Sequence, residues 1–80
     1  MPPSDTPDPR LADAIRRLRE DRGLTQEDVA YRCGLSVSAY ARIERAAVNP
    51  TWTTVVRVAE ALDIGLVDLA RTITDHLADL

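Results

Sequence analysis

The sequence has few of the residues that build disulfide scaffolds, metal sites and aromatic cores. Its 80 residues include one cysteine, one histidine, no phenylalanine and only three aromatic side chains, those of Tyr31, Tyr40 and Trp52. A single cysteine excludes an internal disulfide and any zinc site built on several cysteines. We therefore expect a core of aliphatic and alanine side chains, no bound metal and no cofactor.

The chain also lacks a long apolar run. No segment approaches the ~20 apolar residues of a membrane span, and no signal-peptide pattern opens the sequence, so we expect a cytoplasmic protein with no membrane association. A chain of this length forms roughly one small domain and buries only about 60% of its unfolded surface, which leaves little room for an enclosed active site. No nucleophile–base pair, paired carboxylates or phosphate-binding glycine loop stands out. We expect no enzyme, no catalytic residue and no small-molecule ligand.

Lysine is absent, and all ten basic residues are arginines. The net charge of −3 is unusual for a protein that binds nucleic acid, but the charge is unevenly distributed. Residues 10–45 hold eight arginines and six acidic residues, whereas residues 46–80 hold two arginines and five acidic residues. Positive charge is therefore concentrated in the first two-thirds of the chain.

Five helices and no strands are predicted. Residues 1–8 are rich in proline and are expected to form a disordered leader. Asp8 and Pro9 form a typical helix start, and apolar residues then recur at helical spacing until Gly23. The last two helices are expected after the Asn49–Thr51 break and after Gly65, and the fifth helix is expected to continue through residues 71–80.

The second and third predicted helices are separated by a very short turn. Thr25 is a good N-cap for the second helix, and Ser36 for a third that runs to about Ala46. Only Gly34, Leu35 and Ser36 lie between the two helices, which is the spacing of a helix-turn-helix.

Four sequence blocks follow one another along the chain: LREDRGLTQEDVA (18–30), GLSVSAYARIER (34–45), NPT (49–51) and ALDIGLVDL (61–69). Together they resemble the phage-repressor and Cro-like (XRE-type) helix-turn-helix family, which includes restriction–modification controller proteins. The resemblance implies an all-α, five-helix repressor-type domain over residues 9–70, with the helix-turn-helix at the second and third helices. It also implies a transcriptional regulator that binds a pseudo-palindromic operator in double-stranded DNA as a homodimer.

The resemblance places Val37, Ser38 and Arg42 at base-reading positions of the third helix. Arg42 can pair with guanine, Ser38 can hydrogen-bond several bases, and Val37 can contact a thymine methyl. Two alternatives stay open. Arg42 could contact phosphate only, and Val37 could be an exposed apolar residue without a role.

Other positions of the family pattern predict phosphate contacts and one ion pair. Gln26 lies in the first turn of the second helix, where backbone N–H groups and the helix dipole favour a phosphate. Further expected backbone contacts are Ser36, Tyr40 and Arg45, although Tyr40 also falls on the buried side of its helix. Arg19 and Glu44 match a family pair that ties the first helix to the third. In the alternative interpretation, both are surface charges.

The segment Ala46–Val48 departs from the family pattern, which has a glycine and then basic residues there. Fewer cations predict weaker non-specific DNA affinity and a shallower salt dependence. Without the glycine, the third helix is expected to run on for a residue or two. Alternatively, this apolar segment lines a protein interface.

The apolar stripe of the fifth helix continues beyond what a small core requires. We expect a homodimer interface formed by the fourth and fifth helices, with Trp52, Val56, Ile73, Leu77 and Leu80. In the alternative, the stripe packs onto its own domain. A second function hypothesis is an antitoxin or interaction module, in which another protein docks on the acidic, apolar C-terminal third.

Overall fold

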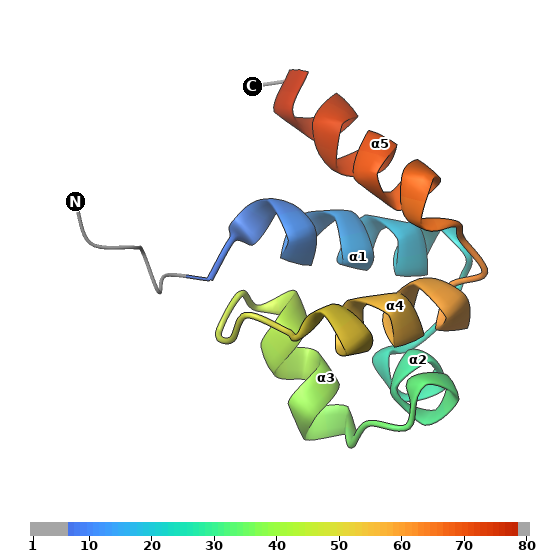
Figure 1. Ribbon diagram of the computed structural model, residues 1–80. Coiled ribbons are helices and arrows are strands. Elements are labelled where there is room, and N and C mark those ends of the chain that lie inside the picture. Colours follow the sequence, from blue (N-terminus) through green and yellow to red (C-terminus); the bar gives the residue numbers. More distant parts are fainter. Residues whose placement is uncertain (1–6, 79–80) are drawn as a thin grey trace.

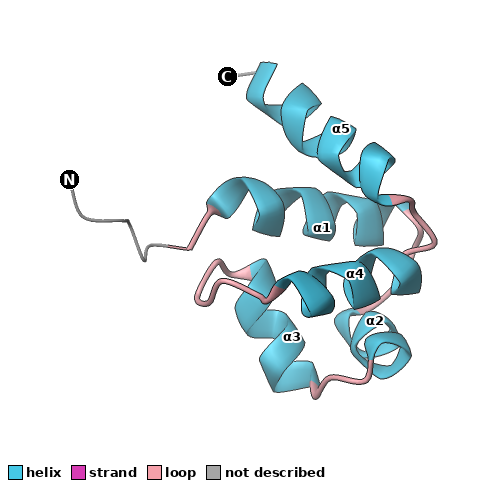
Figure 2. Ribbon diagram, in the orientation of Figure 1, coloured by secondary structure: helices cyan, strands magenta, loops and turns pink. Residues whose placement is uncertain are grey.

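The computed structural model describes residues 7–78, with side chains described as far as Asp75. The described part consists of five helices and their connecting loops, without strands (Figures 1 and 2). The helices are α1 (Pro9–Asp21), α2 (Gln26–Cys33), α3 (Val37–Glu44), α4 (Trp52–Ala61) and α5 (Leu66–Ala78). The predicted all-α class and helix order are confirmed. None of these helices is long and apolar enough to cross a membrane.

The first four helices begin at side-chain N-caps, at the residues the sequence predicts. The caps are Asp8, Thr25, Ser36 and Thr51, and each side chain accepts a hydrogen bond from a backbone N–H in the first turn. Thr25 and Asp28 form a complete capping box, with Asp28 N donating to Thr25 Oγ1 (3.0 Å) and Thr25 N donating to Asp28 Oδ2 (2.8 Å). These caps fix where α2 and α3 start, on either side of the turn.

Helices α1 to α4 each end at a residue in the left-handed conformation. These residues are Gly23, Gly34, Ala46 and Asp63. After α3, Ala46 N donates to Ile43 O (3.1 Å) and Ala47 N donates to Arg42 O (2.9 Å), which is the Schellman pattern. The expected run-on of the third helix is wrong. Ala46 adopts φ 55° despite its β-carbon, so α3 stops at Glu44.

The core lies where the five helices meet, and each of them contributes buried side chains to it. Its largest fully buried side chains are Ile15, Val29, Tyr40, Val58 and Leu62. Helix α2 packs on α3 and α4, and α1 packs on α3 and α5. Figure 1 shows α5 on the opposite side of α1 from α2 and α3. The helix-turn-helix therefore occupies one end of the molecule and α5 the other.

The start of the fold differs by one residue from the predicted domain limit, and the predicted extension of the fifth helix is largely present. Residues 1–6 of the predicted leader lie outside the described residues, whereas Asp8 belongs to the fold. Its side chain caps α1 and its N–H donates to Asn49 Oδ1 (3.2 Å) in the α3–α4 loop. Helix α5 extends to Ala78, so it includes most of the predicted 71–80 extension.

Candidate nucleic-acid interface

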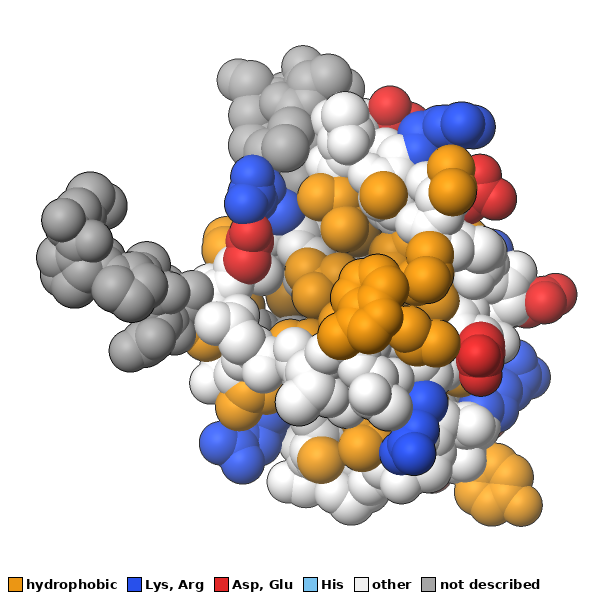
Figure 3. Space-filling view, in the orientation of Figure 1, with side chains coloured by type: hydrophobic (Ala, Val, Ile, Leu, Met, Phe, Trp, Pro, Cys, Tyr) orange, Lys and Arg blue, Asp and Glu red, His pale blue; other side chains and the backbone are white. Residues whose placement is uncertain are grey.

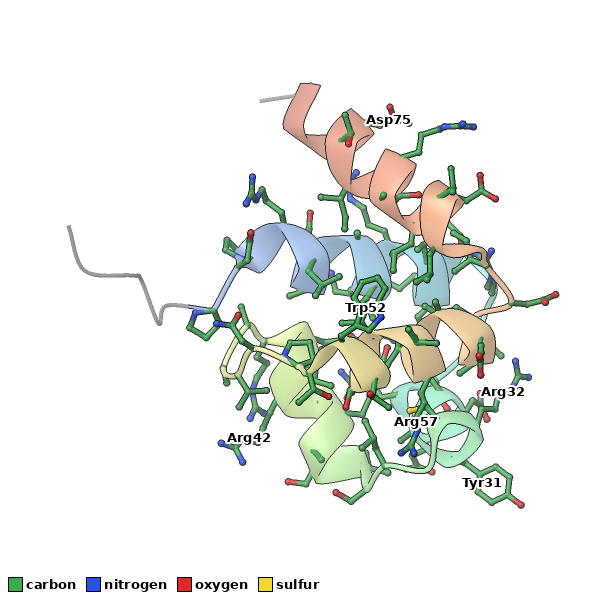
Figure 4. All side chains as sticks on the ribbon, viewed as in Figure 1. Tyr31, Arg32, Arg42, Trp52, Arg57 and Asp75 are labelled. Carbon is green, nitrogen blue, oxygen red and sulfur yellow. The ribbon has the colours of Figure 1, made fainter. Side chains whose placement is uncertain are left out.

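Helix α3 turns one side to the core and the other to the surface. Tyr40 and Ile43 are buried, whereas Val37, Ser38 and Arg42 are exposed. This division follows from the helical repeat, because positions 38 and 42 lie on the face opposite positions 40 and 43, while Val37, in the first turn, lies at the edge of the exposed face and is 42% exposed. In Figure 4, the Arg42 side chain extends from α3 away from the rest of the molecule. The structure thus brings all three predicted base-reading residues to one exposed face.

The exposed face of α3 is positively charged, although the chain as a whole is acidic. The single acidic residue of α3 is Glu44, and its side chain is only 3% exposed. Arg42 and the C-cap residue Arg45 form no ion pair within residues 7–75, whereas four arginines of α1 each lie within 4 Å of a carboxylate: Arg10, Arg16, Arg17 and Arg19. Arg42 and Arg45 therefore differ from the arginines of α1 in having no carboxylate partner among the described residues.

The N-terminus of α2 lies next to α3 and carries Gln26 as its first helical residue. Thr25 Oγ1 accepts the N–H of Asp28, whereas the first N–H groups of a helix have no partner within it. Hydrogen bonds from Thr25 hold the pKa of Asp28 below its usual value, so this carboxylate stays ionised within the cap. Gln26 is half-buried, and its backbone N–H lies at the positive end of the helix dipole.

A buried ion pair connects α1 to α3. Arg19 Nε donates to Glu44 Oε2 (2.7 Å) and Arg19 Nη2 donates to Glu44 Oε1 (3.0 Å). Arg19 Nη1 also donates to Leu24 O (2.9 Å) in the α1–α2 turn. Burial alone would raise the pKa of Glu44, but hydrogen bonds, including those from Arg19 and Gln26, outweigh it and lower that pKa. The predicted pair is therefore present, and it is a buried link rather than a surface contact.

Sequence reasoning missed the third member of this network. Gln26 Nε2 donates to Glu44 Oε1 (3.1 Å), so α1, α2 and α3 meet at one carboxylate. No spacing rule finds this contact, because residues 26 and 44 belong to different helices and their distance depends on the packing of α2 on α3. The signal available in the sequence was only the presence of both residues in the family pattern.

Two of the predicted phosphate contacts differ in accessibility. Ser36 is exposed; its Oγ accepts from Ala39 N (3.1 Å), which leaves the hydroxyl proton free to donate. Tyr40 is fully buried, and its hydroxyl has no hydrogen-bond partner among the described residues. Burial, together with the Glu44 carboxylate, raises the pKa of Tyr40 above its usual range. The expectation that Tyr40 contacts phosphate is not supported, because its position in α3 directs the ring into the core.

A second exposed feature is an apolar face formed by α1, α4 and α5, away from the helix-turn-helix. Figure 3 shows apolar side chains gathered at the centre of this face, with charged side chains around them, and Figure 4 places Trp52 in the middle. Trp52 is 69% exposed, and the groove beside it is lined by Asp8 at its edge and by the apolar residues Leu11, Val55, Leu66, Leu69, Ala70 and Ile73. We call Trp52 and these six apolar residues the apolar face.

The predicted dimer residues are only partly described. Trp52 is exposed on the apolar face, and Val56 and Ile73 are half-buried. The side chain of Leu77 and all of Leu80 lie outside the described residues. Leu11 lines the same groove as Trp52, and the sequence did not predict this, because the arrangement depends on how α1 and α4 pack.

Residues 10–72 match the protein family described as "Helix-turn-helix domain". The chain is also 44% identical over 60 residues to the uncharacterized HTH-type transcriptional regulator y4dJ of Sinorhizobium fredii, covering 75% of this chain and 77% of that protein. The chain belongs to the helix-turn-helix family of transcriptional regulators. The HTH-type transcriptional regulator DdrOP3 of Deinococcus deserti is 33% identical over 60 residues, which cover 75% of this chain but 46% of that longer protein.

Solved structures of a restriction-modification controller protein share this helix-turn-helix fold. The wild-type controller protein C.Esp1396I matches with a TM-score of 0.86 and 24% identity, covering 90% of this chain and 94% of that chain. The tetramer of the same protein in complex with its natural 35 base-pair operator matches with a TM-score of 0.81 and 25% identity, covering 84% of this chain and 88% of that chain. The resemblance predicted from the four sequence blocks is confirmed.

Proposed function

We propose that this helix-turn-helix regulator binds a pseudo-palindromic operator as a homodimer, with α3 of each copy in the major groove. The observation that carries this proposal is the exposed face of α3, where Arg42 and Arg45 are unpaired within the described chain and the only carboxylate is buried. The major groove is about 12 Å wide and admits one helix of this kind. We also propose that the protein acts in the cytoplasm and has no catalytic role.

Three exposed side chains of α3 are proposed to read bases. Arg42 has the length and the paired donors to bind the O6 and N7 atoms of a guanine, and no carboxylate of the described chain competes for it. Ser38 offers a hydroxyl that can donate or accept. Val37, 42% exposed at the start of α3, offers methyl groups to a thymine.

Phosphate contacts are proposed at the edges of α3 and at the start of α2. Gln26 offers side-chain and backbone N–H groups, Ser36 offers a hydroxyl, and Arg45 offers an unpaired cation. The α3–α4 loop adds no cation, since its residues 46–48 are Ala, Ala and Val. We therefore propose that fewer phosphates are neutralised than in relatives with a basic loop.

The apolar face, with Trp52 at its centre, is proposed to be the dimer interface, together with Val56 and the sequence-predicted positions Leu77 and Leu80. An exposed tryptophan within a contiguous apolar surface is typical of an interface hot spot. The face lies on α1, α4 and α5, so a partner seated there leaves α3 free. The controller protein described above, bound to its operator as a tetramer, supports an oligomer on DNA for this fold.

Selection of bound duplexes from a random DNA library at physiological salt tests this proposal. We expect a motif of two inverted half-sites whose centres lie about 34 Å apart, one helical turn. The stoichiometry on that duplex, from sedimentation of the complex, is expected to be two chains per motif. No enriched motif from a folded protein would contradict the proposal, and stoichiometric capture of a different protein by the C-terminal third would favour an interaction module instead.

A further inference from the structure

The hydrogen bond between Gln26 and Glu44 connects the two parts of the proposed DNA surface. Gln26 is the first residue of α2, and Glu44 is the last residue of α3. Gln26 Nε2 lies 3.1 Å from Glu44 Oε1, and this oxygen also accepts Arg19 Nη2 at 3.0 Å. The Glu44 side chain is 3% exposed, whereas Gln26 is half-buried and reaches the surface. The Gln26 amide is therefore hydrogen-bonded to Glu44 on the side that faces the core and accessible to solvent on the other side.

The chemistry of the two groups fixes which end of the amide faces inward. An ionised carboxylate only accepts hydrogen bonds, so Gln26 must present its NH2 group, and not its carbonyl oxygen, to Glu44. One of the two N–H donors is used in this bond, and the other remains available. A free glutamine on a helix surface would sample both amide orientations and several rotamers, and most of them would place no donor toward a phosphate.

The charge of Glu44 does not oppose an incoming phosphate as strongly as a lone carboxylate would. Arg19 contacts both of its oxygens, so the pair is close to neutral as seen from the surface. The backbone N–H groups at the start of α2 add positive partial charge beside Gln26. A phosphate at this position would therefore lie near the N–H donors of α2, and the Arg19–Glu44 pair behind them carries no net charge.

We infer that Glu44, besides linking α3 to α1, is a positioning residue for DNA binding: it holds the Gln26 amide so that its second N–H is aimed at a backbone phosphate. This inference rests on the proposed function and deepens it, because it makes one phosphate contact depend on the packing of α2 against α3. It also differs from a purely structural role for the ion pair, which would stabilise the fold without affecting what Gln26 contributes to affinity.

A double-mutant cycle on operator affinity separates the two roles. In the otherwise unchanged chain, Gln26→Ala is expected to weaken binding about tenfold, the size of one hydrogen bond to a charged group. The background Arg19→Met/Glu44→Met removes both charges and keeps similar volume, a replacement that proteins often tolerate. There, Gln26→Ala is expected to weaken binding less than about twofold, because the amide is no longer held.

Arg19→Lys is the matched control background. It keeps the positive charge and Glu44, so the effect of Gln26→Ala should again be about tenfold. Equal losses in the wild-type and methionine backgrounds, or no loss in the wild type, would overturn the inference while leaving operator binding intact. Failure of the wild-type chain to select any duplex would overturn the proposed function itself.

A second measurement covers the case in which the methionine background does not fold. The chain has one glutamine and one asparagine, Gln26 and Asn49, so the ¹⁵N spectrum of the wild type contains only two side-chain NH2 pairs. In the free protein, the Gln26 pair is expected to show slow exchange with water because one N–H is bonded to Glu44. Operator binding is expected to shift the other proton of that pair. A Gln26 pair that exchanges like a free amide, or does not respond to operator, would overturn the inference.

Discussion

The Arg19 guanidinium and the Glu44 carboxylate form a two-point contact, with Nε–Oε2 at 2.7 Å and Nη2–Oε1 at 3.0 Å. The two residues are 25 positions apart, and their side chains are 14% and 3% exposed. The contact therefore joins α1 to the C-terminal end of α3, the helix proposed to enter the major groove. Gln26 also donates to Glu44, so one buried carboxylate links three helices, and Arg19 in addition donates to Leu24 O in the α1–α2 turn.

Replacing one member of this pair should lower the free energy of unfolding more than replacing both members. Glu44→Met leaves Arg19 without its carboxylate and should lower the free energy of unfolding by about 3 kcal/mol, whereas Arg19→Met/Glu44→Met should lower it by less than about 1 kcal/mol. Urea denaturation of both variants measures the difference. If the single and double variants were equally destabilised, the contact would not be a coupled buried pair.

Acid should destabilise the fold through carboxylates whose pKa is lowered by folding. Hydrogen bonds from Arg10 lower the pKa of Asp8 to about 2, and the pKa values of Asp28 and Glu44 are also lowered. A lowered pKa contributes stability above the unfolded pKa of about 4, and this contribution is lost as the pH falls through the folded pKa. Thermal unfolding should therefore show a midpoint that falls steadily from about pH 4.5 toward pH 2.

The matched variant for the acid experiment is Asp28→Asn. This substitution removes one titrating carboxylate and keeps a side chain that can cap α2. The midpoint of thermal unfolding should therefore depend less steeply on pH below about 4.5. A wild-type midpoint unchanged down to pH 3 would contradict the role given to these carboxylates.

Ala46→Gly should stabilise the protein, although glycine usually destabilises. Ala46 has φ 55°, a conformation that costs a residue with a β-carbon about 1–2 kcal/mol and costs glycine little. The added freedom of the unfolded chain offsets part of this, so a net gain of about 0.5–1 kcal/mol is expected in urea denaturation. Ala47→Gly, at the next position without a positive φ, is the control and should lower stability slightly. A loss at both positions would contradict the conformational argument.

The single tryptophan should report on dimer formation. Trp52 is 69% exposed in the monomer, so its fluorescence should shift to shorter wavelength as protein concentration rises and the apolar face becomes covered. Trp52→Glu should weaken the dimer at least about tenfold in sedimentation equilibrium, because it places a charge in an apolar interface. Tyr31→Glu is the control, since Tyr31 is 89% exposed on α2, away from this face. Equal effects of the two variants would contradict the assigned interface.

Local rules predicted the helix limits well, because caps act within four residues. Thr25 with Asp28, Ser36 and Thr51 start their helices where hydroxyl caps were expected, and Gly34 ends α2 in the left-handed conformation. The position at which α3 ends was predicted wrongly. Alanine does not favour the left-handed conformation that Ala46 adopts, and the glycine that the family pattern has at this position was the available sign that α3 would stop there.

Contacts between helices were predicted only where a family pattern supplied them. The Arg19–Glu44 pair followed from that pattern, whereas the Gln26–Glu44 bond and the place of Leu11 beside Trp52 did not. Both depend on how helices distant in sequence pack, which helical periodicity does not encode. The burial of Tyr40 was visible in the apolar stripe of α3, and periodicity was the better guide there than the family's list of phosphate contacts.

Comparing the DNA motifs selected by the wild type and by Arg42→Ala most directly tests the central claim, that α3 reads bases in the major groove. Both selections use the same random library and salt. We predict that the wild-type motif contains a guanine at one fixed position in each half-site, and that the variant loses preference at that position alone, by about 1–3 kcal/mol, while the other positions keep theirs. An unchanged motif with uniformly weaker binding would contradict the claim and would make Arg42 a phosphate contact.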